Sequence, residues 1–130
     1  MTDRELFDRA CEAMKNAYAP YSRYQVGACL LAEDGRVFTG CNVENSSYGG
    51  TICAERTAVV KAVSEGARRF TAIAVVAENN DAWPCGICRQ VLNEFSLDMR
   101  VICGAASTGK FTVVKLAELL PHSFGPEDLK

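Results

Sequence analysis

Three cysteines and two charged residues lie in two short segments with the spacing of a metal-dependent active site. The segment "TICAERTA" carries Cys53, Glu55 and Arg56. The segment "WPCGICRQVL" carries Cys85 and Cys88, three residues apart. Residues at i and i+3 share one face of a helical turn, so both thiols of the second segment can point the same way. A helix N-terminus stabilises negative charge and lowers thiol pKa, which favours the thiolate form that binds metal.

If two helices present these thiols at one point, three sulfur ligands leave one tetrahedral position for water. Three protein ligands and an open position are typical of catalytic zinc, whereas structural zinc usually has four protein ligands. The sequence has no second Cys-x-x-Cys pair, and its single histidine, His122, lies close to the C-terminal end. We therefore expect Cys53, Cys85 and Cys88 to bind a catalytic Zn²⁺.

Two other interpretations of these cysteines stay open. A closed structural zinc site would need a fourth ligand, such as Cys41 or Cys103. A redox-active pair of Cys85 and Cys88 would also favour a helix N-terminus and a reducing compartment. Neither alternative gives a role to Glu55. The cysteines outside the two motifs lie in apolar or periodic segments, where we expect them to pack as small hydrophobic residues: Cys11, Cys29, Cys41 and Cys103.

Length and composition indicate one globular domain spanning residues 1–130. Hydrophobic residues make up 48% of the chain and charged residues 23%, as in ordinary soluble proteins. The net charge is −2 and the basic residues are scattered, so nucleic acid is not an expected partner. The N-terminus lacks the features of a signal peptide, and no apolar run is long enough to span a membrane. The odd cysteine count fits reduced thiols, and we expect a cytoplasmic protein.

Hydrophobic periodicity and turn residues predict one helix and a hairpin, followed by strands and helices in alternation. The expected helices are 2–18, 54–66, 85–95 and 115–120, and the expected strands are 25–32, 36–44, 70–77, 100–105 and 111–114. The apolar run 70–77 does not alternate, which is typical of a strand covered on both faces. This order predicts an α/β protein with a mixed sheet between helices, a three-layer α-β-α sandwich of about five strands.

Together, "CAERTA" and "PCGICRQVL" resemble the zinc-dependent cytidine deaminases, and "GCNVENSSY" resembles the nucleoside-acting, homotetrameric members. The resemblance extends from "YAPYSRYQVGA" to "LLPHSFGPEDL", which is most of the chain. It implies a cytidine deaminase-like fold and a hydrolase that cleaves a cyclic amidine C–N bond. The implied reaction converts cytidine, and 2'-deoxycytidine, to uridine or deoxyuridine and ammonia, in pyrimidine salvage. It also implies Zn²⁺ on the three cysteines, with a glutamate that is not a ligand.

In this chemistry zinc lowers the pKa of its bound water, and the resulting hydroxide attacks C4 of cytosine. Glu55 would accept the water proton, deliver it to ring N3 and later protonate the leaving amine. Three thiolates should make zinc a weaker Lewis acid, so we expect Arg56 to hydrogen-bond a ligand sulfur and withdraw charge. The alternative for Arg56 is an ordinary surface cation, which is electrostatically unfavourable at a helix start.

The resemblance also implies the substrate contacts. Asn42 and Glu44 alternate in an extended segment, so both side chains point the same way. The resemblance implies that these two hold the ribose 3'-hydroxyl. Tyr24 stands where the family usually has phenylalanine, and we expect it to stack on the base, with its hydroxyl bonded elsewhere. Ala54 completes the implied contacts. The alternatives are that Asn42 and Glu44 are polar residues at a strand end and that Tyr24 only flanks its strand.

Two implied contacts, Tyr48 and Phe124, lie in a loop and in the tail, which we do not expect to reach the same cavity within one small subunit. The resemblance implies that neighbouring chains of a homotetramer supply them, and the apolar face of residues 54–63 is broad enough for a subunit contact. Two alternative functions stay open. One is deamination of a related aminopyrimidine nucleoside, but "NVEN" favours recognition of ordinary ribose. The other is an interaction module stabilised by structural zinc.

Overall fold

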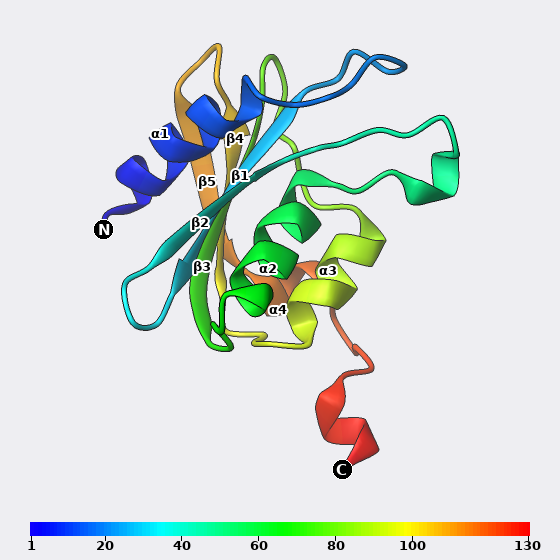
Figure 1. Cartoon of the computed structure of the whole chain (residues 1–130). Helices are drawn as coiled ribbons and strands as arrows, with labels where there is room; N and C mark the ends of the chain where they lie inside the picture. Colours follow the sequence, from blue (N-terminus) through cyan, green and yellow to red (C-terminus); the bar gives the residue numbers. More distant parts are fainter.

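The computed structural model describes residues 1–130 and contains one five-stranded mixed sheet with helices on both faces (Figure 1). The strand order is β2-β1-β3-β4-β5, in which β3 and β4 are parallel and the other neighbouring pairs are antiparallel. The strands are β1 (Val26–Ala32), β2 (Val37–Cys41), β3 (Phe70–Ala77), β4 (Arg100–Ala105) and β5 (Lys110–Lys115). The predicted α/β class with a mixed five-stranded sheet is confirmed.

Helices cover the two faces of the sheet unequally. Figure 1 shows α1 (Asp3–Met14) alone on one face, with α2 (Ala54–Ser64), α3 (Gly86–Asn93) and α4 (Leu116–Leu119) on the other. Alternate residues of β3 pack into two separate apolar clusters, because successive side chains of a strand point to opposite faces. Ala72, Ala74 and Val76 face α1, whereas Ile73, Val75 and Ala77 pack on the side of α2. The three predicted layers are therefore present.

The predicted ends of the first helix and the second strand were wrong. Thr2 caps α1 and bonds reciprocally with Glu5, so the helix begins close to its predicted start, but it ends at Met14 rather than at Tyr18. The second strand ends at Cys41 rather than at residue 44. The residues after Met14 leave the helix, and the residues after Cys41 leave the strand, because Tyr18 pairs with Val43. Val43 also pairs with Ile52. These pairings join three segments beside the N-terminus of α2.

Close packing at Gly40 places α2 directly on β2. A Cβ atom at Gly40 would lie 2.4 Å from the carbonyl oxygen of Ala54 and 2.6 Å from the backbone nitrogen of Ala58. Any larger residue would push the helix away from the strand, because such contacts are closer than van der Waals distance. Glycine at this position therefore fixes where α2 begins relative to the end of β2.

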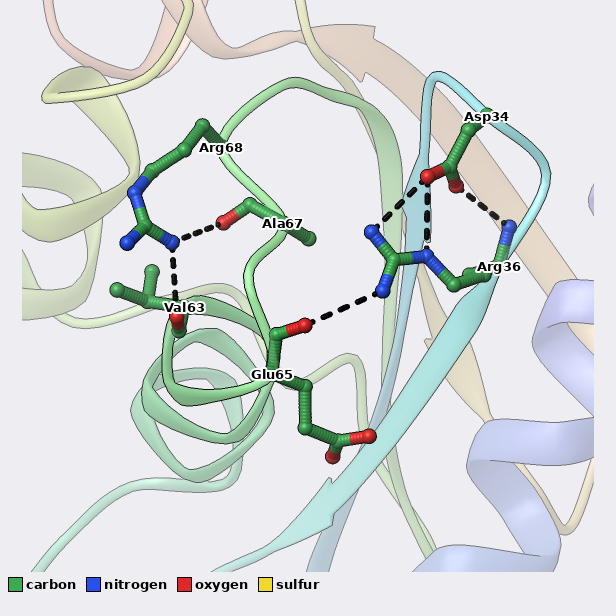
Figure 2. Close-up of polar contacts among 6 residues, drawn as sticks. All are labelled: Asp34, Arg36, Val63, Glu65, Ala67 and Arg68. Carbon is green, nitrogen blue, oxygen red and sulfur yellow. Dashed lines mark hydrogen bonds and ion pairs between the residues drawn. The ribbon is translucent and has the colours of Figure 1, made fainter.

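Two arginines bond to backbone carbonyls at the C-terminal end of α2, and one of them, Arg36, ties this end to the β1–β2 turn (Figure 2). Arg68 donates to the carbonyl oxygens of Val63 and Ala67, at 2.7 and 3.0 Å. Arg36 donates to the carbonyl oxygen of Glu65 at 3.3 Å and pairs with Asp34 at 2.9 Å. Two of the accepting carbonyls, those of Val63 and Glu65, belong to the end of α2, where carbonyl oxygens lack the i+4 amide partner of the helix interior. Cations at this end also complement the helix dipole.

The cysteines outside the two motifs differ in burial. Cys29 and Cys103 are buried in the core, as predicted. Cys11 is half-buried but packs against the apolar cluster under α1, in line with the prediction. Cys41, the last residue of β2, is half-buried and joins neither apolar cluster, so the prediction of core packing was wrong for it. None of the helices combines the length and hydrophobicity that crossing a bilayer requires.

Candidate functional site

Two helix N-termini bring three cysteines together. Cys53 is the N-cap residue of α2, Cys85 is the N-cap residue of α3, and Cys88 lies in the first turn of α3. The three sulfur atoms lie within 4.8 Å of one another, and those of Cys53 and Cys85 are 3.8 Å apart. The two N-cap residues make no side-chain cap bond, which leaves their sulfurs free to bind a ligand.

The sulfur group fits a zinc ion in spacing and chemistry. Zn–S bonds are about 2.3 Å long, so two sulfurs on a tetrahedral ion are about 3.8 Å apart. The Cys53–Cys85 distance of 3.8 Å matches this value. No further Cys, His, Asp or Glu side chain joins the group, so Cys41, Cys103 and Glu55 lie outside it. Three sulfurs without a fourth protein ligand are the pattern of an open zinc site.

Hydrogen bonds within the group favour a thiolate at Cys53. The bond from Cys88, with those from Arg56 and Cys85, lowers the pKa of Cys53 to about 5. The same Cys53–Cys88 bond, together with burial, raises the pKa of Cys88, so this thiol keeps its proton when no metal is bound. Because metal binds the thiolate, the cluster already holds negative charge where zinc would sit.

Arg56 contacts the sulfur group, as its place in the sequence suggested. Its Nη2 atom donates to the sulfur of Cys53 at 3.5 Å. Its Nε atom is buried without a hydrogen-bond partner. The hydrogen bond to Cys53 raises the pKa of Arg56, so the guanidinium stays charged. A cation at this helix end is unfavourable to the dipole, and the neighbouring thiolate offsets that cost.

Glu55 is a buried acid beside the sulfur group. Only 4% of its surface is exposed. Burial raises the pKa of Glu55 to about 7, and the negative charge on Cys53 adds to the rise. An acid with a pKa near neutrality can both accept and release protons at physiological pH. Its position and environment therefore suit general acid–base catalysis.

A cavity of about 260 Å³ opens over the sulfur group and Glu55. It contains most of the residues that sequence analysis assigned to the site. Its lining residues are Ser22, Tyr24, Val26, Asn42, Glu44, Thr51, Ile52, Cys53, Ala54, Glu55, Ala82, Trp83 and Cys85. Cys88 is buried behind Cys85 in the first turn of α3. Tyr48 and Phe124 do not line the cavity, and they are 76% and 60% exposed.

Asn42 and Glu44 both line the cavity and also organise the backbone around it. Asn42 donates to the carbonyl oxygen of Tyr24 at 2.7 Å and accepts from the amide of Val26 at 2.9 Å. Glu44 accepts from the amides of Tyr21 and Ser22 at 2.9 and 3.1 Å. The hydroxyl of Ser22 also donates to Glu44, and this bond lowers the pKa of that carboxyl. Glu44 therefore carries a negative charge in the lining of the cavity.

The cavity also contains residues that sequence analysis missed. Trp83 and Ala82 line the wall beside Cys85, in a segment treated only as a loop. The hydroxyl of Tyr24 accepts a hydrogen bond from Asn80 at 3.0 Å, which supplies the partner that a tyrosine at this position needs. The only feature of the sequence that could have indicated this part of the wall is Trp83 itself, an aromatic residue directly before Pro84 and Cys85.

The C-terminal tail is attached to α3. Gln90 and the buried Asn93 both donate to the carbonyl oxygen of Phe124, at 2.7 and 3.0 Å. A Cβ atom at Gly125 would lie 2.9 Å from the side-chain nitrogen Nδ2 of Asn93, so the tail lies close against the helix there. The backbone at Phe124 is thus fixed while its ring stays exposed.

Comparison with known proteins gives concordant results. Residues 1–105 match the family model for the cytidine and deoxycytidylate deaminase zinc-binding region. A cytidine deaminase from Sporosarcina psychrophila is 47% identical over 130 residues, which cover 99% of this chain and 96% of that protein. One from Halalkalibacterium halodurans is 50% identical, with 98% of each chain covered. The crystal structure of a Burkholderia pseudomallei cytidine deaminase superposes with a TM-score of 0.91 at 46% identity, covering 95% of this chain and 100% of that one.

Proposed function

Because the chain belongs to the zinc-binding cytidine and deoxycytidylate deaminase family, we propose that it hydrolyses cytidine to uridine and ammonia. The observation that carries this proposal is one cavity lined by two chemically different sets of residues. Cys53 and Cys85 of the three-sulfur group and the buried acid Glu55 form the first set, and Asn42 and Glu44 form the second. The first set suits deamination of a base, and the second suits recognition of a sugar.

Cys53, Cys85 and Cys88 would hold the zinc ion. When bound, zinc supplies a Lewis acid that lowers the pKa of water, so that water can attack C4 of the ring at neutral pH. Glu55 takes one proton from the attacking water and delivers it to ring N3, which makes C4 more electrophilic. Glu55 then carries the second proton to the amino group, which leaves as ammonia while the carbonyl of uridine forms. Arg56 withdraws charge from Cys53 through its hydrogen bond to that sulfur.

Asn42 and Glu44, the polar pair of the cavity lining, would bind the 3'-hydroxyl of the sugar. Glu44 supplies a carboxylate and Asn42 an amide, and both are already oriented by backbone contacts. Because 2'-deoxycytidine keeps the 3'-hydroxyl, we propose it as a second substrate. Tyr24 would stack on the base, in an orientation set by its bond to Asn80. Glu44→Ala should weaken uridine binding by roughly 10- to 100-fold, because a hydrogen bond to a charged group is lost.

We propose that the site is completed in a homotetramer by Tyr48 and Phe124 of neighbouring chains. Both rings are exposed and lie outside the cavity of their own chain. An apolar groove between α2 and α3 supports a subunit contact on this face; it is lined in part by Val59, Val60, Val63, Val91 and Phe95. Sedimentation of the active protein should give four chains. A monomer with full activity would contradict this proposal.

We propose the cytoplasm as the location of this enzyme. All seven cysteines are free thiols, which supports a reducing compartment. The sulfur group also needs reduced cysteines to bind zinc. Fractionation of the source cells should recover cytidine deaminase activity with cytoplasmic markers, and recovery with extracellular markers would contradict the location.

The function is tested by following cytidine loss through its ultraviolet absorbance. The parent protein should convert cytidine to uridine, and Glu55→Gln should lose activity by roughly 10²- to 10⁴-fold while it keeps its zinc. The matched control is Glu65→Gln, which changes an exposed acid at the other end of the same helix. The control should keep parent activity. A parent without cytidine turnover, or a Glu55→Gln variant with full turnover, would overturn the proposal.

A further inference from the structure

Trp83 is an aromatic wall of the cavity to which the deamination chemistry gives no role. It lies two residues before Cys85 and, like Cys85, lines the cavity. Its neighbours Ala82 and Pro84 are buried, whereas 38% of Trp83 is exposed. The segment is therefore anchored by small buried residues, while the large ring of Trp83 faces accessible space. An exposed indole beside an apolar cavity is suited to contact with a flat ligand.

The segment that carries Trp83 is fixed on both sides. On one side, Asn80 donates to the hydroxyl of Tyr24 at 3.0 Å and links the segment to another residue that lines the cavity. On the other side, the carbonyl oxygen of Pro84 accepts from Nε of Arg89 at 2.6 Å. Arg89 also donates to the carbonyl oxygen of Leu119 at 2.9 Å. Because these bonds hold the segment that carries it, Trp83 is positioned to limit the space in the cavity.

The chemistry indicates which edge of the base Trp83 would face. Carbon C4 of cytosine lies between N3 and C5 in the ring. Under the proposed function, N3 faces Glu55, which delivers its proton there. The C5 edge then lies on the side away from Glu55, and Ala82 and Trp83, which directly precede Pro84 and Cys85, are lining residues that could contact it. We propose that Trp83 contacts the pyrimidine ring and limits the size of the substituent admitted at C5. This inference rests on the proposed function.

Trp83 is the only tryptophan of the chain, so its fluorescence reports on this contact directly. Saturating uridine should change the emission of the zinc-loaded parent protein and shield Trp83 from quenching by acrylamide. The concentration dependence should match inhibition of cytidine turnover by uridine. Unchanged emission and unchanged quenching at uridine concentrations that inhibit turnover would overturn the contact.

Base selectivity tests the size limit. Trp83→Ala should raise kcat/KM for 5-methylcytidine relative to cytidine by roughly tenfold, because the pocket gains room for one methyl group. Trp83→Phe should keep a preference close to that of the parent. The matched control is Leu97→Ala, which removes an apolar side chain of similar exposure, 37%, outside the cavity. If the Trp83→Ala variant still binds zinc and its kcat/KM for 5-methylcytidine relative to cytidine equals that of the parent, the size limit is overturned.

These outcomes are separate from those of the proposed function. If the parent protein does not deaminate cytidine, the proposed function fails. If the parent deaminates cytidine but Trp83 does not respond to uridine, only the role of Trp83 fails. Thermal melting and zinc content of each variant show whether the fold and the sulfur group are intact.

Discussion

The two ends of α2 use arginine in opposite ways. Beyond the C-terminal end, Arg68 is exposed and donates to two backbone carbonyls, where a cation also complements the helix dipole (Figure 2). At the N-terminal end, Arg56 opposes the dipole, leaves its Nε buried without a partner and donates to the sulfur of Cys53. Local stability accounts for the first arrangement and not for the second.

The same contrast applies to the acids of the helix. Glu65 follows its last turn and is exposed, whereas Glu55 is buried in the first turn with a raised pKa. A buried carboxyl and a partly unsatisfied guanidinium both cost stability. Such costs are concentrated at functional sites, where the strained or buried group takes part in the chemistry. The N-terminal end of α2 is therefore the functional end, and the C-terminal end is the structural one.

Removal of a sulfur ligand at the N-terminal ends of α2 and α3 should have the largest effect on zinc binding and on turnover. Cys85→Ala deletes one of the three sulfurs, so we expect zinc loss and a fall in kcat/KM of at least about 10³-fold, because the nucleophile is no longer activated. Zinc content and cytidine turnover measure both effects. The matched control is Cys11→Ala on α1, the helix across the sheet, which should keep zinc and activity. A Cys85→Ala variant that retains zinc and full turnover would break the comparison.

Arg56 should have the next largest effect. Arg56→Ala removes the hydrogen bond to Cys53, and loss of such a ligand-supporting contact lowers metal affinity or activity by about 10- to 100-fold. The release of zinc to a coloured chelator should be faster, and kcat should be lower, while the fold is kept. Arg68→Ala, the equivalent change at the other end, should leave both unchanged. Unchanged zinc release and kcat in Arg56→Ala would remove its tuning role.

Arg68 should have the smallest effect, and it should act on stability alone. Arg68→Ala loses two hydrogen bonds to carbonyls near the end of α2, which should lower the free energy of unfolding by about 1 kcal/mol. Urea denaturation measures this change. Arg69→Ala is the matched control, because it removes a neighbouring exposed cation. Equal stability of Arg68→Ala and the parent would mean that the bonds in Figure 2 do not stabilise the helix end.

Sequence patterns located the elements best where the contacts are local or the apolar run is long. The strands 70–77 and 100–105 have their predicted bounds. The ends of α1 and β2 were misplaced because Tyr18 and Val43 pair with each other across the chain, and no local pattern reveals that pairing. In each case the competing interaction lies far away in the sequence.

The same distinction between local and long-range contacts applies to the residues of the candidate site. Motif spacing predicted the sulfur group, because N-terminal helical turns place residues at i and i+3 together. The resemblance supplied Asn42 and Glu44, which line the cavity. Trp83 was missed, because its place in the wall depends on the bond between Asn80 and Tyr24, which are 56 positions apart. The placement of Tyr48 and Phe124 depends on neighbouring chains, and it stays a prediction.

The most direct test of the central claim is X-ray absorption at the zinc edge of the purified protein. Three sulfurs at about 2.3 Å and one lighter atom, with one zinc per chain, are the expected result. This result would mean that Cys53, Cys85 and Cys88 hold the ion and that one position is open for water. Four sulfur neighbours would contradict the account, because a closed site leaves no position at which Glu55 could act.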